Sequence, residues 1–394
     1  MLTRFIVLLC FMYSHYSKAQ WSEQNSGTFN HLRGIDFIDS LTGITVGHNG
    51  EIIKTVDGGQ NWNNIPSPNN ETYWKIHFFN DSVGWIVGAK GTLLKTKDRG
   101  ESWNIINIGI TTDFESIFFI NDSIGWICGK NGIVYKTIDT GNNWVNKSIT
   151  VPKYLSVIHF INDSIGFLGS EDGIYRTDNG GDSWLKLNVT TLGIHDVFFI
   201  NNSVGWFCGE NGSVYKTENG GLDWVEQESH VSNWLHDIHF VNLNYGWIVG
   251  RKGKMIYTIN GGETWFPYPN SLASNTHIIS VDFTDVNNGW ACASSGTIIK
   301  YTKDPNLNTT SFSNQTLNIY PNPVSETSKI QFSQTNSEVQ LALFDINGKN
   351  LGSSFFNKTQ DGQYEFNRGV LATGLYYIVV EHQDDVWSEK IVLE

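Results

Sequence analysis

The stretch KTVDGGQNW (residues 54–62) combines an acidic residue, two glycines and a tryptophan, and the chain contains six copies of it. A catalytic loop is normally needed once, so a motif repeated this often indicates architecture. In each copy an Asp or Asn can accept hydrogen bonds from following backbone N–H groups, a glycine permits positive φ, and the Trp can cover a sheet. The predicted structural residues are Asp57, Gly59, Trp62, Asp98, Gly100, Trp103, Asp139, Gly141, Trp144, Asn179, Gly181, Trp184, Asn219, Gly221, Trp224, Asn260, Gly262 and Trp265.

A second landmark is the glycine that opens an apolar segment such as GWICG (125–129), and it returns with a period of about 40 residues. Between these glycines, short segments rich in aromatic and β-branched residues alternate with turn residues, which is typical of propeller blades with four strands. The landmark glycines are Gly43, Gly84, Gly125, Gly166, Gly205, Gly246 and Gly289. We therefore predict an all-β fold with a seven-bladed β-propeller; six blades and a degenerate seventh is the alternative.

The last repeat lacks its outer strand. No closing Trp follows IIKYT (298–302), whereas Trp21 precedes Trp62 by one period without the first three strands of a blade. We expect the segment QWSEQ (20–24) to supply the missing strand, so that the propeller is closed by the N-terminal strand. Closure of this kind removes an exposed sheet edge.

The chain divides into four predicted segments. Residues 1–19 have the charge, apolar core and small-residue site of a signal peptide, with cleavage between Ala19 and Gln20. The propeller covers 20–302, and the Asn/Ser/Thr-rich stretch 303–316 reads as a linker. Residues 317–394 contain strand-like segments that predict a small Ig-like β-sandwich.

Composition narrows the possible partners. A formal net charge of −13 argues against a nucleic-acid ligand, which requires a basic surface. No later stretch has the length of a transmembrane helix. Cys128, Cys208 and Cys292 share one repeat position in separate units, so we expect unpaired, buried thiols. We expect a monomer without a cofactor.

The repeat itself resembles a known family. Residues 76–103 and 117–144 show its pattern well, from an inner strand through Gly-Trp to Lys-Thr, an Asp box and a closing Trp. Residues 21 to about 302 resemble the Ycf48/HCF136 family of photosystem II assembly factors, which are propellers of the BNR or Asp-box type. This resemblance implies an assembly chaperone that uses an arginine-rich strip. The propeller departs from it in having few arginines, which are Arg33, Arg99, Arg176 and Arg251.

The tail carries a second resemblance. LNIYPNP (317–323), LFDINGKNL (343–351), LATGLYYIVV (371–380) and the terminal KIVLE are similar to the type A C-terminal sorting domain of the type IX secretion system. The resemblance implies passage through the periplasm and across the outer membrane, after which the protein is secreted or attached at the cell surface. Glu394 stands where that family usually has a basic residue.

Candidate binding residues lie on the innermost strands, near the end where propellers usually present ligands. Two neighbouring repeats share a motif, IHDVFF (194–199) and LHDIHF (235–240), so the His-Asp pair of one is expected beside that of the next. Such groups can bind a metal or act as general bases, but we favour repeat duplication, with polar groups hydrated near a water-filled channel. The predicted residues are Arg33, Trp74, Glu115, His195, Asp196, His236, Asp237 and Trp234.

Two functions remain open. We expect a binding or assembly scaffold with no catalytic residue and no metal, whose partner is a protein or a polysaccharide. The alternative is a secreted glycoside hydrolase with acids among Asp36, Glu115, Asp196, Asp237 and Asp282, because such enzymes need two carboxylates about 5–10 Å apart. A sialidase is disfavoured, since the three arginines that would clamp its substrate are missing.

Overall fold

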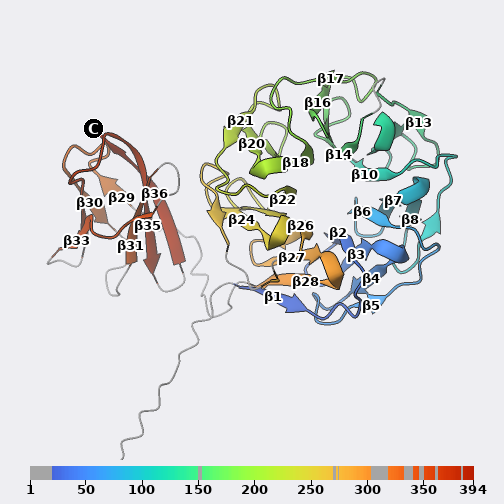
Figure 1. Cartoon of the computed structure of the whole chain (residues 1–394), viewed down its shortest axis with the longest axis horizontal. Coiled ribbons are helices and arrows are strands. Elements are labelled where there is room, and N and C mark those ends of the chain that lie inside the picture. Colours follow the sequence, from blue (N-terminus) through green and yellow to red (C-terminus); the bar gives the residue numbers. More distant parts are fainter. Residues whose placement is uncertain are drawn as a thin grey trace, which may run out of the picture.

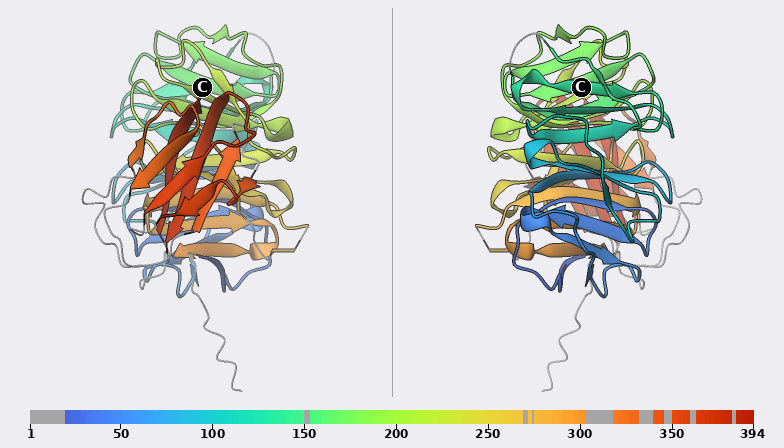
Figure 2. Two further views of the ribbon diagram at one scale, coloured as in Figure 1. Left: turned by 90° about the vertical axis from the view of Figure 1, so that its left-hand side faces the viewer. Right: turned by 90° about the vertical axis from the view of Figure 1, so that its right-hand side faces the viewer.

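The structure is a computed structural model that describes residues 20–149, 153–268, 272–273, 275–302, 318–331, 340–345, 350–359, 363–382 and 385–394. The predicted signal peptide 1–19 and the predicted linker 303–316 lie outside the described residues. Figure 1 shows a ring of sheets followed by a smaller β unit, and Figure 2 shows the strands of the ring running through its thickness.

Within the described part of 20–302, the strands pair into seven four-stranded antiparallel sheets, here called blades 1 to 7. Each blade begins with an inner strand that lies next to the ring axis and is paired with a second strand opened by the landmark glycine. The inner strands are β2 (Leu32–Phe37), β6 (Tyr73–Phe78), β10 (Phe114–Phe119), β14 (Leu155–Phe160), β18 (Ile194–Phe199), β22 (Leu235–Phe240) and β26 (Ile278–Asp285). The second strands are β3 (Gly43–Gly47), β7 (Gly84–Gly88), β11 (Gly125–Gly129), β15 (Gly166–Ser170), β19 (Gly205–Gly209), β23 (Gly246–Gly250) and β27 (Asn288–Ala293).

The third strands end on the Thr that opens the Asp box, and the fourth strands are very short. The third strands are β4 (Ile52–Thr55), β8 (Leu93–Thr96), β12 (Val134–Thr137), β16 (Gly173–Thr177), β20 (Val214–Thr217), β24 (Met255–Thr258) and β28 (Ile298–Thr302). The outer strands of blades 1 to 6 are β5 (Asn63–Asn64), β9 (Asn104–Ile105), β13 (Val145–Asn146), β17 (Leu185–Lys186), β21 (Val225–Gln227) and β25 (Phe266–Pro267).

Single 3-10 turns join the second and third strands of most blades. At their centre stands a residue in the left-handed region, for example Asn131 with φ 59°, followed by Gly132 with φ 71°. Asn and Gly tolerate this conformation, as the sequence predicts for this hairpin. The turns are η1 (His48–Gly50), η2 (Ala89–Gly91), η3 (Lys130–Gly132), η4 (Glu210–Gly212), η5 (Arg251–Gly253) and η6 (Ser294–Gly296).

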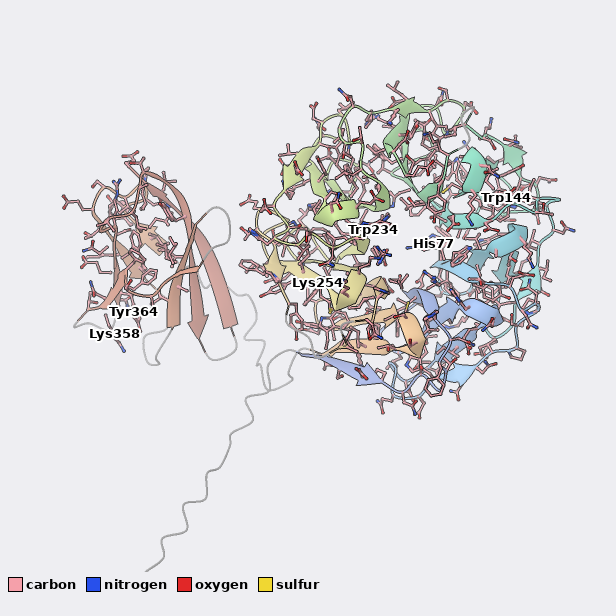
Figure 3. The ribbon with its side chains drawn as sticks, viewed as in Figure 1. His77, Trp144, Trp234, Lys254, Lys358 and Tyr364 are labelled. Carbon is pink, nitrogen blue, oxygen red and sulfur yellow. The ribbon has the colours of Figure 1, made fainter. Side chains whose placement is uncertain are left out.

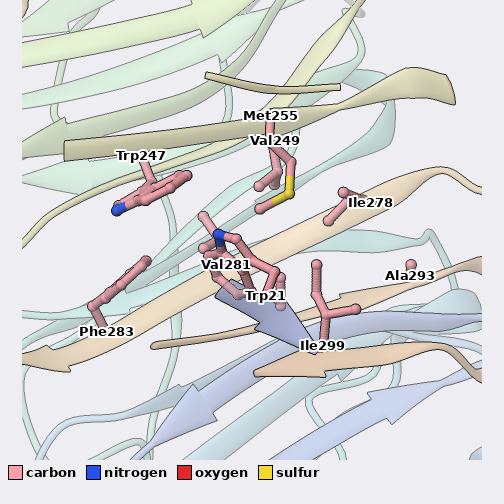
Figure 4. Packing of buried hydrophobic residues seen from close by; sticks show 10 residues of the cluster. Trp21, Trp247, Val249, Met255, Ile278, Val281, Phe283, Ala293 and Ile299 are labelled. Atoms are coloured by element: carbon pink, nitrogen blue, oxygen red, sulfur yellow. The ribbon is translucent and has the colours of Figure 1, made fainter. Parts of the chain in front are cut away.

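Blade 7 is completed by β1 (Gln20–Gln24), which pairs antiparallel with β28 from Gln20↔Thr302 to Gln24↔Ile298. Trp21 is buried and meets Trp247 edge-on at 5.5 Å between ring centroids and Phe283 at 5.7 Å. Figure 4 shows these side chains packed together with strands from two blades. The all-β propeller with closure by the N-terminal strand is therefore confirmed.

The hydrophobic core lies mainly between neighbouring blades. One cluster joins Ile44 and Val46 of blade 1 to Tyr73, Phe78 and Trp103 of blade 2, and similar clusters follow around the ring. Cys128, Cys208 and Cys292 are free and buried in this core. Each blade is therefore stabilised by the faces of its neighbours, which suits a closed ring.

The Asp boxes form one end of the propeller, called here the Asp-box face, with the turns between first and second strands beside them. In blade 1 the Asp57 Oδ1 accepts hydrogen bonds from the Thr55 hydroxyl (2.8 Å) and the Asn61 N–H (2.9 Å). Thr55 Oγ1 in turn accepts the N–H of Gly59 at 2.8 Å. The corresponding bonds recur in blades 2 to 6. The six turns therefore satisfy their own backbone groups.

The closing Trp residues are not equally buried. Trp62, Trp103 and Trp265 are 9%, 6% and 1% exposed, whereas Trp144, Trp184 and Trp224 are half-buried. Figure 3 shows Trp144 at the periphery of the ring.

The tail forms two four-stranded sheets around a separate core of Val324, Ile330, Leu343, Phe366 and Ile378 with neighbours. One sheet has the order β29-β30-β34-β33 and the other β32-β31-β35-β36. The strands are β29 (Asn318–Tyr320), β30 (Thr327–Gln331), β31 (Gln340–Asp345), β32 (Asn350–Gly352), β33 (Phe356–Lys358), β34 (Tyr364–Asn367), β35 (Gly374–His382) and β36 (Asp385–Leu393).

Candidate functional site

In each of the two His-Asp motifs, the local geometry of the strand separates the His side chain from the Asp side chain. His195 and His236 are half-buried near the start of β18 and β22, whereas Asp196 and Asp237 are buried, 7% and 5% exposed. A register shift in each inner strand lies at this point, between Ile194/Asp196 in blade 5 and the equivalent residues of blade 6. Because successive side chains of a strand leave it on different sides, the His and Asp of one motif do not act together.

The buried carboxylates of the inner strands join each blade to the next. Asp196 Oδ2 accepts the N–H of Ile238 at 3.1 Å, and Asp237 Oδ2 accepts the N–H of Val281 at 2.7 Å. The same contact recurs from Asp36 to the Phe78 N–H, 2.8 Å, and from Asp282 to the Phe37 N–H, 2.7 Å. These carboxylates satisfy backbone donors at the seams between blades.

Lys75 of β6 reaches across the ring axis. Its Nζ lies 3.3 Å from Asp237 Oδ1, although blades 2 and 6 are not neighbours. Burial and the adjacent Asp237 carboxylate raise the pKa of Asp196 well above its ordinary value, while a side-chain hydrogen bond links the two acids. Burial lowers the pKa of Lys75, but the Asp237 and Asp196 carboxylates outweigh it and raise that pKa overall. We infer a proton shared by the acid pair, with Lys75 neutralising the remaining charge.

A second layer along the axis alternates imidazole, aromatic and carboxyl groups. His77 stacks on Phe118 at 5.3 Å, His159 lies 4.4 Å from the same ring, and the His239 Nδ1 is 3.3 Å from Asp282. Burial lowers the pKa of His77 to about 4 and that of His159 to about 3. His77 and His159 are therefore neutral near pH 7. Figure 3 shows His77 near the centre of the ring.

The remaining predicted residues gather at the end of the ring opposite the Asp-box face. We call this end the inner rim and define it by Arg33, His48, Trp74, Glu115, Tyr154, His195, Trp234, His236, Arg251 and His277. The rim is formed by the residues at the start of the inner strands and by the turns η1 and η5. Hydrogen bonds hold these turns against the strand starts; for example, the Arg251 N–H donates to the Trp234 carbonyl at 2.9 Å. The rim therefore draws side chains from several blades to one end of the axis.

Two arginines of the inner rim lie over tryptophan faces. The Arg33 guanidinium is 5.0 Å from the Trp74 ring centroid, and that of Arg251 is 4.2 Å from the Trp234 ring. Arg33 Nε also donates to His48 Nε2 at 3.0 Å. Among the described residues, no carboxylate forms an ion pair with either guanidinium. The rim thus holds two oriented positive charges that form no ion pair within the described chain, and the Glu115 carboxylate lies within electrostatic reach of Arg33.

The histidines of the inner rim are held as neutral rings. His195 lies 5.4 Å from the His236 ring in a stacked arrangement, and its Nδ1 is 2.7 Å from the carbonyl oxygen of Leu235. Burial lowers the pKa of His236 to about 3, and the charges of Arg251 and Arg33 act in the same direction. His236 therefore lies within the electrostatic reach of both arginines.

Glu115 and Tyr154 form a hydrogen-bonded pair at the inner rim, within electrostatic reach of Arg33. The Tyr154 hydroxyl donates to Glu115 Oε2 at 3.0 Å, and burial raises the pKa of Glu115. Burial and the Glu115 carboxylate also raise the pKa of Tyr154 far above its ordinary value. A phenol in this state is a poor nucleophile, so the pair does not activate Tyr154 for covalent chemistry.

These contacts bear on the two interpretations of the sequence. His195 lies beside His236 and Asp196 beside Asp237, as the shared motif predicts. The four groups do not form one ligand cluster, because the imidazoles face the rim while the carboxylates bind the next blade. Within the described segments, no group of three or more His, Cys, Asp or Glu is placed to hold a metal ion. Four of the five carboxylates considered for hydrolysis accept backbone N–H groups between blades, which does not favour an acid pair acting on a sugar.

Several residues of the site were missed from the sequence. Lys75 stands in YWKIHF at a position where other repeats have Gly, Ser, Val or Asp, and that departure was the available signal. Arg251 lies in the turn η5, and its stacking on Trp234 depends on the tertiary structure. His48, Tyr154 and His277 lie outside the inner strands and gave no local signal.

Comparison with protein families gives two matches. The model described as photosynthesis system II assembly factor YCF48 matches residues 13–109, 61–193 and 223–318. The model described as secretion system C-terminal sorting domain matches residues 318–394. A comparison with curated protein sequences finds no significant match.

Solved structures resemble the propeller. A structure of YCF48 bound to D1 peptide matches with a TM-score of 0.61 and 20% identity, covering 73% of this chain and 98% of that one. YCF48 from Cyanidioschyzon merolae matches with 0.61 and 19%, over 72% and 99%. The WD40 β-propeller domain of Doa1 gives 0.59 and 13%, over 72% and 98%. At these identities the likeness concerns the fold. In the part of the chain that the structure describes, no helix has the length and hydropathy needed to cross a bilayer.

Proposed function

The chain belongs to the family of photosynthesis system II assembly factor YCF48, and from that premise we propose that it is a non-catalytic propeller that binds a protein partner at its inner rim. The observation that carries the proposal is the set of side chains at the inner rim. Trp74 and Trp234 are half-buried there, each with an arginine over its ring, and they lie among histidines at positions whose residue varies between repeats. Tryptophan and arginine are the residues most often found at the centres of protein interfaces.

The ligand of a related structure supports a protein partner over a polysaccharide. A YCF48 structure is described as bound to D1 peptide, so a propeller of this family accepts a peptide. The inner rim of the present chain has aromatic rings that are partly covered by arginine side chains. A sugar needs an open aromatic face to stack on, whereas a peptide can use the edges and charges that remain.

We further propose that the tail exports the propeller. The chain carries a secretion-system C-terminal sorting domain, and the sequence predicts a signal peptide ahead of the propeller. Passage through the periplasm to the medium or the cell surface follows from this combination. Deletion of 318–394 should leave the propeller in the periplasmic fraction, whereas export that is unaffected would contradict this route.

A site-specific photocrosslinking experiment tests the binding proposal. A photoreactive residue is placed either at exposed Ser232, two residues before Trp234, or at Leu222, which is 66% exposed in the Asp box of blade 5. The full chain is exposed to cell-envelope extract and irradiated. We expect one dominant protein adduct from position 232 and none from position 222.

A matched pair of variants completes the test. His195→Ala/Trp234→Ala should abolish capture of the same protein, and Leu222→Ala should leave it unchanged. Adducts that form equally from both faces, or a polysaccharide as the only retained material, would overturn the proposal.

A further inference from the structure

We propose that the boundary between blades 6 and 7 on the Asp-box face binds a glycine-containing turn of a partner protein. We call this surface the blade 6–7 seam and define it by Leu243, Trp247, Tyr257, Val286, Asn287 and Tyr301. It lies at the end of the ring opposite the inner rim, so it is separate from the surface of the proposed function. At this seam alone in the described ring, the contact between an Asp box and the preceding blade is interrupted.

The six other seams of the described ring show what normally covers this position. In each, the residue after the box Asp or Asn accepts a hydrogen bond from the preceding blade and donates its N–H to a turn of its own blade. Gly180, for example, accepts from Trp126 Nε1 at 3.0 Å and donates to the Ser164 carbonyl at 2.7 Å. The donors from the preceding blades are Lys54, Lys95, Trp126, Arg176, Trp206 and Trp290. The Asp boxes thus form a blade-to-blade interface that continues around the face up to the blade 6–7 seam.

At the blade 6–7 seam, the groups that would contact an Asp box have no partner. Trp247 is equivalent to Trp126, yet within the described chain its Nε1 donates no hydrogen bond. Trp247 is 8% exposed, whereas the second-strand aromatic residues of the other blades are at most 1% exposed. The carbonyl of Asn287, equivalent to that of Ser164, accepts no hydrogen bond from the described residues, and the Asn287 Oδ1 is buried without a partner. A donor and an acceptor are therefore left for a group from outside.

The sequence of the chain itself does not supply the missing turn. The register of β28, compared with that of β4, aligns Pro305 with Gly59, which has φ 89°. Proline fixes φ near about −65°, so it is not compatible with this position. A shift by one residue aligns Pro305 with Gly58, which has φ 70° and excludes proline equally. Ahead of Trp21 the aligned residue is Lys18, within the predicted signal peptide.

Glycine is required because the turn approaches the ring of the preceding blade closely. A Cβ added to Gly141 would lie 2.2 Å from the Trp85 ring, and one added to Gly221 would lie 2.3 Å from the Phe167 ring. Both glycines also have positive φ, which other residues adopt only at a cost. A turn that reaches Trp247 in the same way must therefore have glycine at this position.

Aromatic rings form the floor of the blade 6–7 seam (Figure 4). Trp21 and Tyr301 lie 5.5 and 5.4 Å from Trp247 between ring centroids, and Tyr257 stacks on it at 5.1 Å. Tyr257 stands where the third strands of the other blades have Lys or Arg, so a ring replaces the cation. Because Trp21 already takes the place of the closing Trp, the turn that binds needs no Trp of its own.

The border of the seam is apolar. Leu243 and Val286 are 51% and 38% exposed in the turns between the first and second strands of blades 6 and 7. The aligned residues of blades 2 to 4 are Asp81, Asp122 and Asp163. Exposed aliphatic groups around a desolvated aromatic centre are typical of protein interfaces. The border therefore favours a protein as the source of the bound turn.

The test uses the peptide 54–63 of this chain as a preformed Asp-box turn. Lys54→Cys and Asn63→Cys, which face each other in β4 and β5, are joined by a disulfide, and Trp62→Ala removes the ring that Trp21 already provides. Fluorescence anisotropy measures binding of the labelled peptide to the full chain. We expect saturable binding, and a Gly59→Pro form of the peptide should bind at least about tenfold more weakly.

Variants of the full chain locate the bound peptide. Trp247→Phe keeps a ring but removes Nε1, and it should reduce the affinity about three- to tenfold. Trp85→Phe is the matched control, because the Asp box of blade 3 already covers that ring. Leu243→Asp gives blade 6 the residue of blades 2 to 4, and it should weaken binding without changing the melting curve. If Trp247→Phe alters the melting curve, Leu243→Asp decides.

Other outcomes contradict a binding site at this seam. No saturable binding, equal affinity for the Gly59→Pro peptide, or an equal loss with Trp85→Phe would overturn it, as would an unchanged affinity in both Trp247→Phe and Leu243→Asp. His195→Ala/Trp234→Ala should leave the peptide affinity unchanged, and a loss there would place the peptide at the inner rim instead. Failure of the crosslink from position 232 would remove the proposed function alone, since the peptide test does not depend on it.

Discussion

The Asp-box face and the inner rim are formed by opposite ends of the same strands, yet they differ in how closely the repeats agree. On the Asp-box face, six turns make the same set of hydrogen bonds with nearly the same residues. At the inner rim, one repeat position is filled in turn by Arg33, Trp74, Glu115, Ser156, His195, His236 and Ile279. Repetition therefore marks the part that holds the blades together, and variation marks the part that is free to bind.

The physical reason lies in where the polar groups of each end are satisfied. An Asp-box turn satisfies its backbone N–H groups with the side-chain oxygens of its own Thr and Asp or Asn, so a replacement that lacks such an oxygen leaves a donor without a partner. A rim side chain lies at the start of a strand whose backbone is already hydrogen-bonded to the neighbouring strand. The residue can therefore be substituted without loss of those backbone hydrogen bonds. The following predictions compare the two ends, starting with the largest expected effect on stability.

Trp265→Ala should lower the free energy of unfolding by about 3–5 kcal/mol, because this Asp-box tryptophan is fully buried. Trp144→Ala should lower it less, since Trp144 is half-buried. Val225→Ala, at a residue that is 65% exposed, is the control and should change it by less than about 0.5 kcal/mol. Denaturant titration measures all three, and equal losses at Trp265 and Trp144 would contradict the ranking.

Lys75→Met should destabilise the propeller by about 2 kcal/mol, because it leaves the Asp196–Asp237 pair without its cation. The effect is smaller than for a fully buried pair, since the Lys75 side chain is partly exposed. Lys75→Met/Asp237→Asn should recover part of the loss. Strictly additive losses in a double-mutant cycle would show that the two side chains do not interact.

Two arginines that each lie over an aromatic ring allow a direct comparison of the core with the rim. Arg176→Gln should lower the free energy of unfolding by about 1–3 kcal/mol, because buried Arg176 donates to the Gly220 carbonyl of the next blade. Arg251→Gln should change it by less than about 0.5 kcal/mol, because Arg251 is exposed. Similar losses at both positions would assign Arg251 to the framework.

Asp196→Asn should change how the free energy of unfolding depends on pH more than it changes the magnitude of that free energy. Burial and Asp237 raise the folded pKa of Asp196, so its contribution is present below about pH 4 and is lost as pH rises through that raised value. Asn mimics the protonated acid and has no such loss. The stability of the variant relative to wild type should therefore increase with pH in denaturant titrations between about pH 5 and 9. A constant difference would mean that Asp196 is ionised throughout.

Much of the fold could be predicted from local sequence. The spacing of the landmark glycines and the repeated Asp boxes determine the strands and turns, because each motif acts within a few residues of itself. The position of Trp21, one period before Trp62, was enough to predict that β1 completes blade 7. The unequal burial of the closing tryptophans was not predictable, since it depends on the neighbouring blade.

The candidate site was predictable only in part. The inner-strand residues Arg33, Trp74, His195 and His236 lie at one end of the ring, and Trp234 directly precedes its inner strand. Asp196 and Asp237 do not join them, because adjacent side chains of a strand leave it on different sides and both carboxylates bind backbone N–H groups of the next blade. Chain periodicity gives the position along a strand, but it does not give the group that a side chain meets in the next blade.

By itself, therefore, the sequence determined the repeat, the closure of the ring and the presence of a sorting tail, since these depend on short motifs and their spacing. The tertiary structure alone decided which charges meet. Lys75 and Asp237 are 162 residues apart, and Arg33 and Arg251 come from blades 1 and 6. Closing the ring brings these residues together, because every inner strand then lies around one axis, whatever its distance along the chain.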